Sequence, residues 1–172
     1  MIEVEVKARL SLAHARQVLK ELKAEFVESE EHYDIYYNAP HRNFAETDEA
    51  LRLRLVNGRS VMTYKGEKLD ELTKSREELQ TDVEWDSTQA ILDRLGFTKT
   101  STVEKVRDVY KVGNITVCLD QVDSLGEFVE FELFTEKSIE ESRDRLFELM
   151  ENFGLGIEDS IRKSYLELVM GE

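Results

Sequence analysis

Apolar and polar residues alternate in eight separate stretches of the chain. Side chains on a β-strand point to opposite faces in turn, so this alternation predicts strands with one apolar and one polar face. The pairs Asn57-Gly58 and Gly113-Asn114 stand between consecutive stretches and indicate tight hairpins, so the strands around them should be antiparallel. The predicted strands are residues 2–10, 26–37, 50–57, 60–65, 76–85, 98–111, 115–121 and 128–134.

Four other segments carry apolar residues three and four positions apart, which is the spacing of an amphipathic helix. A serine lies close before each segment, and its hydroxyl can accept from the free N–H groups of a first helical turn. The polar stretch 66–75 lies between two predicted strands and is expected to be a mobile lid. The predicted helices are residues 12–22, 89–95, 139–153 and 161–170, with Ser11, Ser87, Ser138 and Ser160 as their caps.

A weak internal repeat bears on domain organisation. Residues 18–38 and 91–111 each contain a helix end, a strand and an Asp-x-Tyr sequence, in the same order. A chain of 172 residues is also the size of one well-packed domain. We therefore expect a single domain, residues 1–172, built from two related halves, about 1–85 and 86–172.

The polar faces of the predicted strands are strongly ionic. On the first strand Glu3, Glu5 and Lys7 share the face opposite three aliphatic residues. Two carboxylates spaced in this way can hold a divalent cation, and a neighbouring lysine can contact the phosphate that such a cation carries. The complete ionic face comprises Lys7, Arg52, Arg54, Lys65, Arg76, Lys105 and Arg107 together with Glu3, Glu5, Glu78, Asp120, Glu130 and Glu132.

Two arrangements would account for these faces. In an open sheet, the apolar face would pack on helices and the ionic face would lie in water. In a closed eight-stranded barrel, the ionic face would instead line a lumen beneath an outer layer of helices. Such a lumen suits a triphosphate, because arginine and lysine bind its oxygens while carboxylates hold Mg²⁺ or Mn²⁺. The prominence of arginine favours the lumen, but the pattern alone leaves both arrangements open.

Composition excludes some partners. The net charge of −14, from 37 acidic and 23 basic residues, argues against general binding to nucleic acid or to an anionic membrane surface. The sequence contains neither an apolar run long enough to cross a bilayer nor a signal-peptide pattern. Cys118 is the only cysteine, which is typical of a reducing compartment, and the three histidines lack zinc-site spacing. We therefore expect a cytoplasmic protein.

The opening Glu-Val-Glu-Val-Lys resembles the ExExK signature of the CYTH superfamily, which includes class IV adenylyl cyclases, thiamine triphosphatases and inorganic triphosphatases. The similarity continues, in the family's order, through most of the chain. HYDIYYNAP at 32–40 and SYLEL at 164–168 are most similar to the class IV adenylyl cyclase branch. The other matching segments are ALRLR at 50–54, TYKG at 63–66, SREE at 75–78, KVRDVY at 105–110 and LDQVDSLGEFVEFE at 119–132.

The resemblance implies an α+β fold in which a closed eight-stranded antiparallel barrel forms a triphosphate tunnel, with helices packed outside. It implies Mg²⁺ or Mn²⁺ as cofactor and catalytic roles for Glu3, Glu5, Lys7 and Arg107. One departure from the family pattern is Gln80, which replaces the second glutamate of an Arg-x-Glu-x-Glu sequence. The implied metal ligands are Glu3, Glu5, Asp120, Glu130 and Glu132, and the implied triphosphate ligands are Lys7, Arg52, Arg54, Lys65, Arg76, Lys105, Arg107 and Lys163.

The best prediction for the reaction is conversion of ATP into cyclic AMP and pyrophosphate. Hydrolysis of thiamine triphosphate or inorganic tripolyphosphate is the alternative, since both reactions need the same hold on a triphosphate. A third alternative is a sensor that binds a nucleotide or polyphosphate without reaction. The expected partner is a small triphosphate, with no nucleic acid and no membrane, and a homodimer is compatible with this branch.

Overall fold

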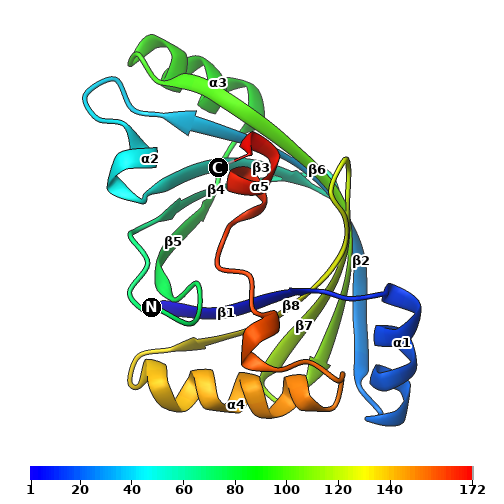
Figure 1. The fold of residues 1–172 in the computed structure, drawn as a ribbon. Helices are drawn as coiled ribbons and strands as arrows, with labels where there is room; N and C mark the ends of the chain where they lie inside the picture. Colours follow the sequence, from blue (N-terminus) through cyan, green and yellow to red (C-terminus); the bar gives the residue numbers. More distant parts are fainter. Residues whose placement is uncertain (172) are drawn as a thin grey trace.

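The computed structural model describes residues 1–171 and shows eight antiparallel strands closed into a barrel (Figure 1). Around the wall the strands follow the order 1, 5, 4, 3, 2, 6, 7, 8. The strands are β1 (Ile2–Arg9), β2 (Glu25–Asn38), β3 (Ala50–Val56), β4 (Arg59–Lys65), β5 (Arg76–Asp82), β6 (Thr98–Val112), β7 (Ile115–Val122) and β8 (Gly126–Thr135).

The first strand closes the barrel. β1 pairs along its whole length with β8, from Ile2 opposite Thr135 to Arg9 opposite Phe128. On its other side β1 pairs with β5 over a short stretch that includes Glu3 opposite Arg76. Because both of its sides are paired, the sheet is closed, and the predicted barrel is confirmed over the open sheet.

The hairpin predicted at Asn57-Gly58 is also confirmed, between β3 and β4. Asn57 and Gly58 have φ angles of 47° and 79°. Positive φ at both central residues is the geometry of a type I′ turn, whose twist matches that of the paired strands. Glycine adopts this conformation without steric cost, and asparagine tolerates it.

The apolar core lies outside the barrel wall. Val4 and Val6 of β1 and Phe131 of β8 point outward and are buried against α1 (Leu12–Glu21) and α4 (Ile139–Glu151). Removal of this apolar surface from water holds the helices on the wall and leaves the ionic faces inside. Ser11 and Ser138 cap these two helices, as predicted.

Two helices begin at other residues than the sequence predicted. α3 (Trp85–Arg94) begins four residues before the predicted start, and β5 ends at Asp82 to make room for it. The cap is Glu84, whose carboxylate accepts from the backbone N–H groups of Asp86 and Ser87. A carboxylate at this position accepts from the free N–H groups and complements the helix dipole. The prediction considered only serine as a cap and therefore placed the start of the helix too late.

The last helix also starts elsewhere. α5 (Tyr165–Met170) is capped by Ser164, and the Glu167 carboxylate accepts in return from the Ser164 backbone N–H. Ser160, the predicted cap, donates its hydroxyl to the Leu72 carbonyl instead. Two further elements, α2 (Phe44–Thr47) and η1 (Ile157–Asp159), are too short to show helical periodicity in the sequence.

The predicted lid, residues 66–75, is packed onto the barrel. The Asp70 carboxylate accepts from the Thr73 backbone N–H at 2.8 Å and from the Arg143 guanidinium of α4 at 3.0 Å. Arg162 donates to the Asp70 carbonyl at 2.7 Å, and the Lys74 backbone N–H donates to the Glu5 carbonyl at 2.9 Å. These contacts pack the segment onto the barrel, and its mobility in the absence of a ligand stays a prediction.

The C-terminal segment crosses one opening of the barrel before α5 (Figure 1). The Ile161 backbone N–H donates to the Lys7 carbonyl at 2.7 Å, and Tyr165 is buried.

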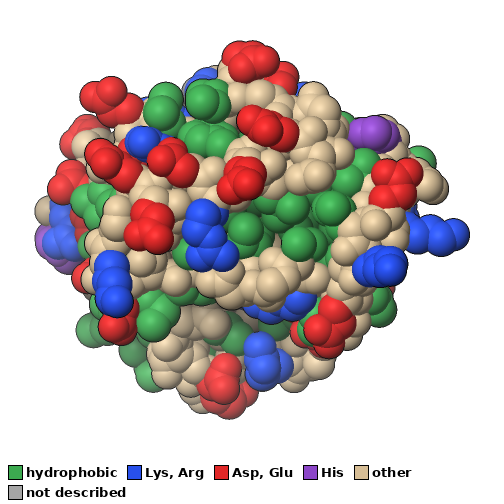
Figure 2. Space-filling view, turned by 90° about the horizontal axis from the view of Figure 1, so that it is seen from below, with side chains coloured by type: hydrophobic (Ala, Val, Ile, Leu, Met, Phe, Trp, Pro, Cys, Tyr) green, Lys and Arg blue, Asp and Glu red, His purple; other side chains and the backbone are tan. Residues whose placement is uncertain are grey.

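Seen from the side of α4, the outer surface carries acidic, basic and apolar side chains intermixed (Figure 2). None of the helices within residues 1–171 is long and apolar enough to cross a membrane. The prediction that the chain consists of two related halves, about 1–85 and 86–172, stays a prediction.

Candidate active site

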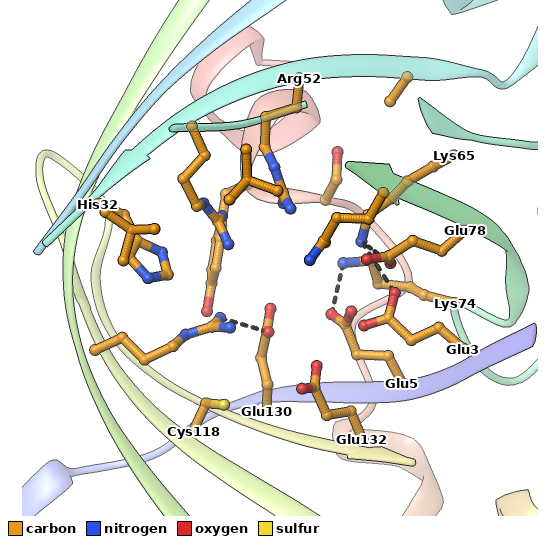
Figure 3. A pocket seen from close by; sticks show the side chains of 18 of the residues that line it. Glu3, Glu5, His32, Arg52, Lys65, Lys74, Glu78, Cys118, Glu130 and Glu132 are labelled. Carbon is orange, nitrogen blue, oxygen red and sulfur yellow. Dashed lines mark hydrogen bonds and ion pairs between the residues drawn. The ribbon is translucent and has the colours of Figure 1, made fainter. Parts of the chain in front are cut away.

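The barrel lumen is a cavity of about 290 Å³ with ionic walls. Figure 3 shows Arg52 on one wall and Glu5, Glu130 and Glu132 on the opposite wall, with their side chains pointing into the space between. Of the predicted ionic face, only Lys7 and Asp120 are absent from the lining. The ionic residues that line the cavity are Glu3, Glu5, Glu30, Arg52, Arg54, Arg59, Lys65, Lys74, Arg76, Glu78, Lys105, Arg107, Glu130 and Glu132.

Three carboxylates form a compact cluster on the wall made by β1 and β8. Glu5 stands directly opposite Glu132 in the strand register, and Glu3 is two residues away on the same face. One oxygen from each of the three lies within 4.8 Å of the others. Neighbouring strands thus bring together carboxylates that are far apart in the sequence.

This cluster fits a divalent cation. Burial, reinforced by the charges of Glu3 and Glu5, raises the pKa of Glu132 well above its usual range. A positive ion among the three groups would remove that repulsion. Carboxylate oxygens are the ligands that Mg²⁺ and Mn²⁺ prefer. Glu3, Glu5 and Glu132 are therefore the residues that would hold the ion.

The other two predicted metal ligands are engaged elsewhere. Arg107 donates to both oxygens of Asp120 at 2.6 Å and to Glu130 at 2.7 Å. Asp120 also accepts from the Tyr165 hydroxyl at 2.6 Å. The structure thus places Asp120 and Glu130 in an arginine-centred network rather than in the three-carboxylate cluster, because Arg107 supplies their counter-charge.

Basic side chains of β3 and β6 line the wall that faces the cluster. Asp34 fixes two of them, accepting from Arg54 at 2.7 and 2.8 Å and from Lys105 at 3.5 Å. Arg52 donates to Thr63, but its Nε is buried without a hydrogen-bond partner among residues 1–171. An unpaired buried guanidinium donor suits an anionic oxygen.

Burial and neighbouring charges shift the pKa values of two lysines in opposite directions. Burial and the nearby Arg54 lower the pKa of Lys105 to about 7, although Asp34 opposes the shift. Burial would also lower the pKa of Lys65, but Glu3 and Glu78, each 3.1 Å from its ammonium, raise it above the usual range. Lys65 is therefore a fixed cation, whereas Lys105 changes charge near neutral pH.

Three predicted phosphate ligands lie outside the cavity lining or bond to backbone carbonyls. Lys7 is fully buried, donates to the Lys163 carbonyl at 3.0 Å and lies 3.8 Å from the centre of the Tyr165 ring. The Lys163 side chain is exposed and lies outside the cavity lining. Arg76 lines the cavity while its guanidinium donates to the Gly66 carbonyl at 2.6 Å.

Sequence reasoning missed several residues of the site, including Lys74, Asp34 and Tyr165. Lys74 reaches in from the loop and donates to Glu5 at 2.8 Å, which lowers the pKa of Glu5 to about 2 against the effect of burial. Lys74 shares the parity of Arg76, so extending the strand alternation backward would have found it. Parity along β2 would likewise have placed Asp34 on the inner face, whereas Tyr165 lies in the SYLEL segment, whose pattern did not indicate a side chain in the site.

The family model of the CYTH domain matches residues 1–165. The chain belongs to the CYTH domain family. A Methanocaldococcus jannaschii relative, named as a candidate adenylate cyclase, is 36% identical and aligns over 98% of both chains. The adenylate cyclase CyaB of Aeromonas hydrophila is 28% identical over 96% of this chain and 87% of its own.

Solved CYTH-like structures agree with the barrel. The PH1819 protein of Pyrococcus horikoshii has a TM-score of 0.90 and 37% identity, covering 98% of each chain. A Hippeastrum protein described as having dominant triphosphatase activity has a TM-score of 0.70 over 99% of this chain and 96% of its own, and at 19% identity shares the fold alone. These comparisons confirm the family and the tunnel fold predicted from the sequence, and they leave the reaction to be decided by the site.

Proposed function

We propose that this chain is a divalent-metal-dependent enzyme that acts on a triphosphate, and that its reaction is conversion of ATP into cyclic AMP and pyrophosphate. The observation that carries the proposal is a closed lumen in which a cluster of three carboxylates faces basic side chains of β3 and β6. The carboxylates Glu3, Glu5 and Glu132 lie on one wall, and basic side chains, including Arg52 with its unpaired Nε, line the other. The names of the two aligned relatives favour the cyclase over other triphosphate reactions.

The basic residues would bind and orient the triphosphate. Arg52, Arg54 and Lys65 offer fixed donors to its non-bridging oxygens, and Arg54 is held in position by its two bonds to Asp34. As the bond to the leaving pyrophosphate breaks, negative charge grows on oxygens that these cations already contact. Stabilisation of that developing charge is the largest contribution such a site makes.

In the cyclase reaction, the ribose 3′-hydroxyl attacks the α-phosphorus, pyrophosphate leaves, and a carboxylate of the cluster accepts the hydroxyl proton. A divalent ion held by Glu3, Glu5 and Glu132 would supply Lewis acidity at the phosphate oxygens. The closed wall and the packed segment 66–75 would keep bulk water from competing with the ribose hydroxyl.

Hydrolysis of thiamine triphosphate or tripolyphosphate is the second candidate. The same cations would bind the triphosphate, and a water molecule would attack the terminal phosphorus. The activity described for the Hippeastrum protein of the same fold supports this candidate. A non-catalytic sensor is disfavoured, because the buried carboxylates that metal chemistry needs are all present.

A product assay tests the proposal. The purified protein is incubated with ATP, thiamine triphosphate and tripolyphosphate, each with Mg²⁺ or Mn²⁺, and cyclic AMP, ADP, thiamine diphosphate and phosphate are separated. Cyclic AMP and pyrophosphate in equal amounts from ATP support the cyclase. Release of phosphate from any substrate without cyclic AMP shows a triphosphatase. Full activity in excess EDTA would refute the dependence on metal.

A further inference from the structure

The lumen changes character along its axis. On β3 the inward residues run from Arg52 and Arg54 to Val56, and on β6 they run from Lys105 and Arg107 to Val109. Of the other strands, β8 shows the same change from Glu130 and Glu132 to Phe134, whereas β1 and β2 keep the charged Glu3 and Glu30 on the lining. We call these uncharged lining residues of β3, β4, β6, β7 and β8 the collar, and they are Val56, Val61, Val109, Thr116 and Phe134.

The collar marks the end of the lumen that reaches solvent. Phe134 lines the cavity and is 49% exposed, and the side chain of Arg59, which also lines the cavity, is 67% exposed. The opposite end is closed by Tyr165, which is 5% exposed, packs on Phe128 and bonds to Asp120. A triphosphate held by the basic residues therefore has room for an organic group only toward the collar.

One buried polar atom beside the collar lacks a partner. His32 is paired with Val56 in the strand register, and Figure 3 shows its ring on the lumen wall. Its Nε2 is hydrogen-bonded to the Glu30 carboxylate, and its side chain is 1% exposed. Its Nδ1 is buried and has no hydrogen-bond partner within residues 1–171. Leaving such an atom unsatisfied is costly, so a ligand group is its natural partner.

The charge of the ring decides which kind of ligand group fits. Burial, together with Arg54, Lys105 and Arg107, lowers the pKa of His32 below its usual range, so the imidazole is neutral. Burial and a hydrogen bond with Glu28 raise the pKa of Glu30, and Arg107 opposes that rise. When Glu30 is ionised, its carboxylate accepts the proton of Nε2–H, and Nδ1 is then an acceptor that calls for an N–H donor.

We propose that the collar and the Glu30–His32 pair bind the adenine base of the nucleotide, with His32 Nδ1 accepting a hydrogen bond from the 6-amino group. This inference rests on the proposed function, since the triphosphate must lie among the basic residues. Phe134 offers an exposed aromatic face for stacking, which any base can use. His32 is thus the residue that distinguishes adenine from a base with an oxygen at the same position.

Calorimetric titration with ATP, ITP and inorganic tripolyphosphate tests this assignment. EDTA is present so that no turnover occurs. ATP and ITP share ribose and triphosphate and differ at the 6-position, whereas tripolyphosphate has no base. The wild type should bind ATP about tenfold more tightly than ITP, the effect of one hydrogen bond to a buried acceptor. His32→Phe should bring ATP and ITP to within about twofold and leave tripolyphosphate unchanged.

Two variants sharpen the test. His32→Gln keeps a neutral acceptor and should retain part of the preference for ATP. His41→Phe, at an exposed histidine outside the lumen, should change none of the three affinities. The melting temperature of each variant shows whether it is folded, and His32→Gln carries the test if His32→Phe is not.

The outcomes separate this inference from the proposed function. If tripolyphosphate binds but ATP and ITP bind equally to the wild type, the base assignment is wrong and the triphosphate site stands. A preference for ATP that persists in His32→Phe would also overturn it, as would an equal loss of all three affinities. If none of the three ligands binds the wild type, the proposed function fails and this inference fails with it.

Discussion

Lys74 is expected to take the place of a metal ion at the carboxylate cluster. Its ammonium lies 2.8 Å from Glu5, and the exposed fractions of the two side chains are 7% and 4%. A divalent ion bound by the cluster would have to compete with this ammonium for the same carboxylate. Replacing Lys74 with methionine should therefore have two opposite effects, a loss of stability without metal and a gain in metal affinity.

The size of the stability loss follows from burial. Removing one partner of a buried ion pair typically costs about 3–5 kcal/mol, because the remaining charge stays buried without compensation. For a chain of this size each kcal/mol lowers the melting temperature by about 2–4 °C. The Lys74→Met protein without metal should melt roughly 6–20 °C below the wild type at neutral pH.

The pH dependence gives an independent check. Lys74 lowers the pKa of Glu5 from 4.5 to about 2 against the effect of burial. A carboxyl group with a depressed pKa stabilises the folded state above its unfolded pKa, and this contribution is lost as pH falls from about 4.5 toward 2. The difference between wild type and Lys74→Met should therefore shrink as the solution is acidified through this range.

Thermal denaturation across a series of Mg²⁺ and Mn²⁺ concentrations measures both effects. Metal should stabilise Lys74→Met by about 2.7 kcal/mol at 100 times its Kd, and the wild type, whose Kd should be higher, by less at the same metal concentration. Lys68→Met is the matched control, since Lys68 lies in the same loop but bonds to Asp48 and Glu167 outside the cluster. A Lys74→Met protein as stable as the wild type, or one with weaker metal affinity, would refute the competition.

Three further predictions concern the reaction and its ligand. Glu132→Gln should lower the rate by at least about 10²-fold through loss of a metal ligand, and Glu127→Gln, exposed on the same strand, should retain full activity. Deleting residues 69–73 should shift the products of a cyclase from cyclic AMP toward hydrolysis, and an unchanged ratio would show that this segment does not exclude water. Binding of metal-free tripolyphosphate should cause Lys105 to take up a proton at pH 8 but not at pH 6, because the anion raises the low pKa of this lysine. Calorimetry in two buffers with different ionisation enthalpies measures this proton uptake, which Lys105→Met should reduce.

The sequence predicted the faces of the strands well. Alternation with a period of two is a local property of an extended backbone, so the residue order alone assigns Arg52, Arg54 and Glu132 to one face. The same reasoning predicted the hairpins and two of the helix caps. It was wrong for the starts of α3 and α5, where Glu84 and Ser164 supply the caps, because several nearby residues can satisfy the same free N–H groups.

The partners of the ionic residues could not be obtained in this way. Parity places Asp120 and Glu132 on the same inner surface, but only the strand register shows that Glu132 lies opposite Glu5 while Arg107 lies opposite Asp120. Lys74 has the parity of Arg76, but its contact with Glu5 joins the loop before β5 to β1, segments that are far apart in the chain. The fold, rather than the pattern, therefore decides which carboxylates cluster together and which ones pair with an arginine.

The sequence by itself determined that this chain makes amphipathic strands with one ionic face, since side-chain alternation depends only on neighbouring residues. Only the tertiary structure decided that this face is a lumen. Closure depends on β1 pairing with β8 and β5, segments that are far away in the chain. Such pairing is set by the burial of the outer apolar faces under α1 and α4, a long-range effect that no local pattern contains.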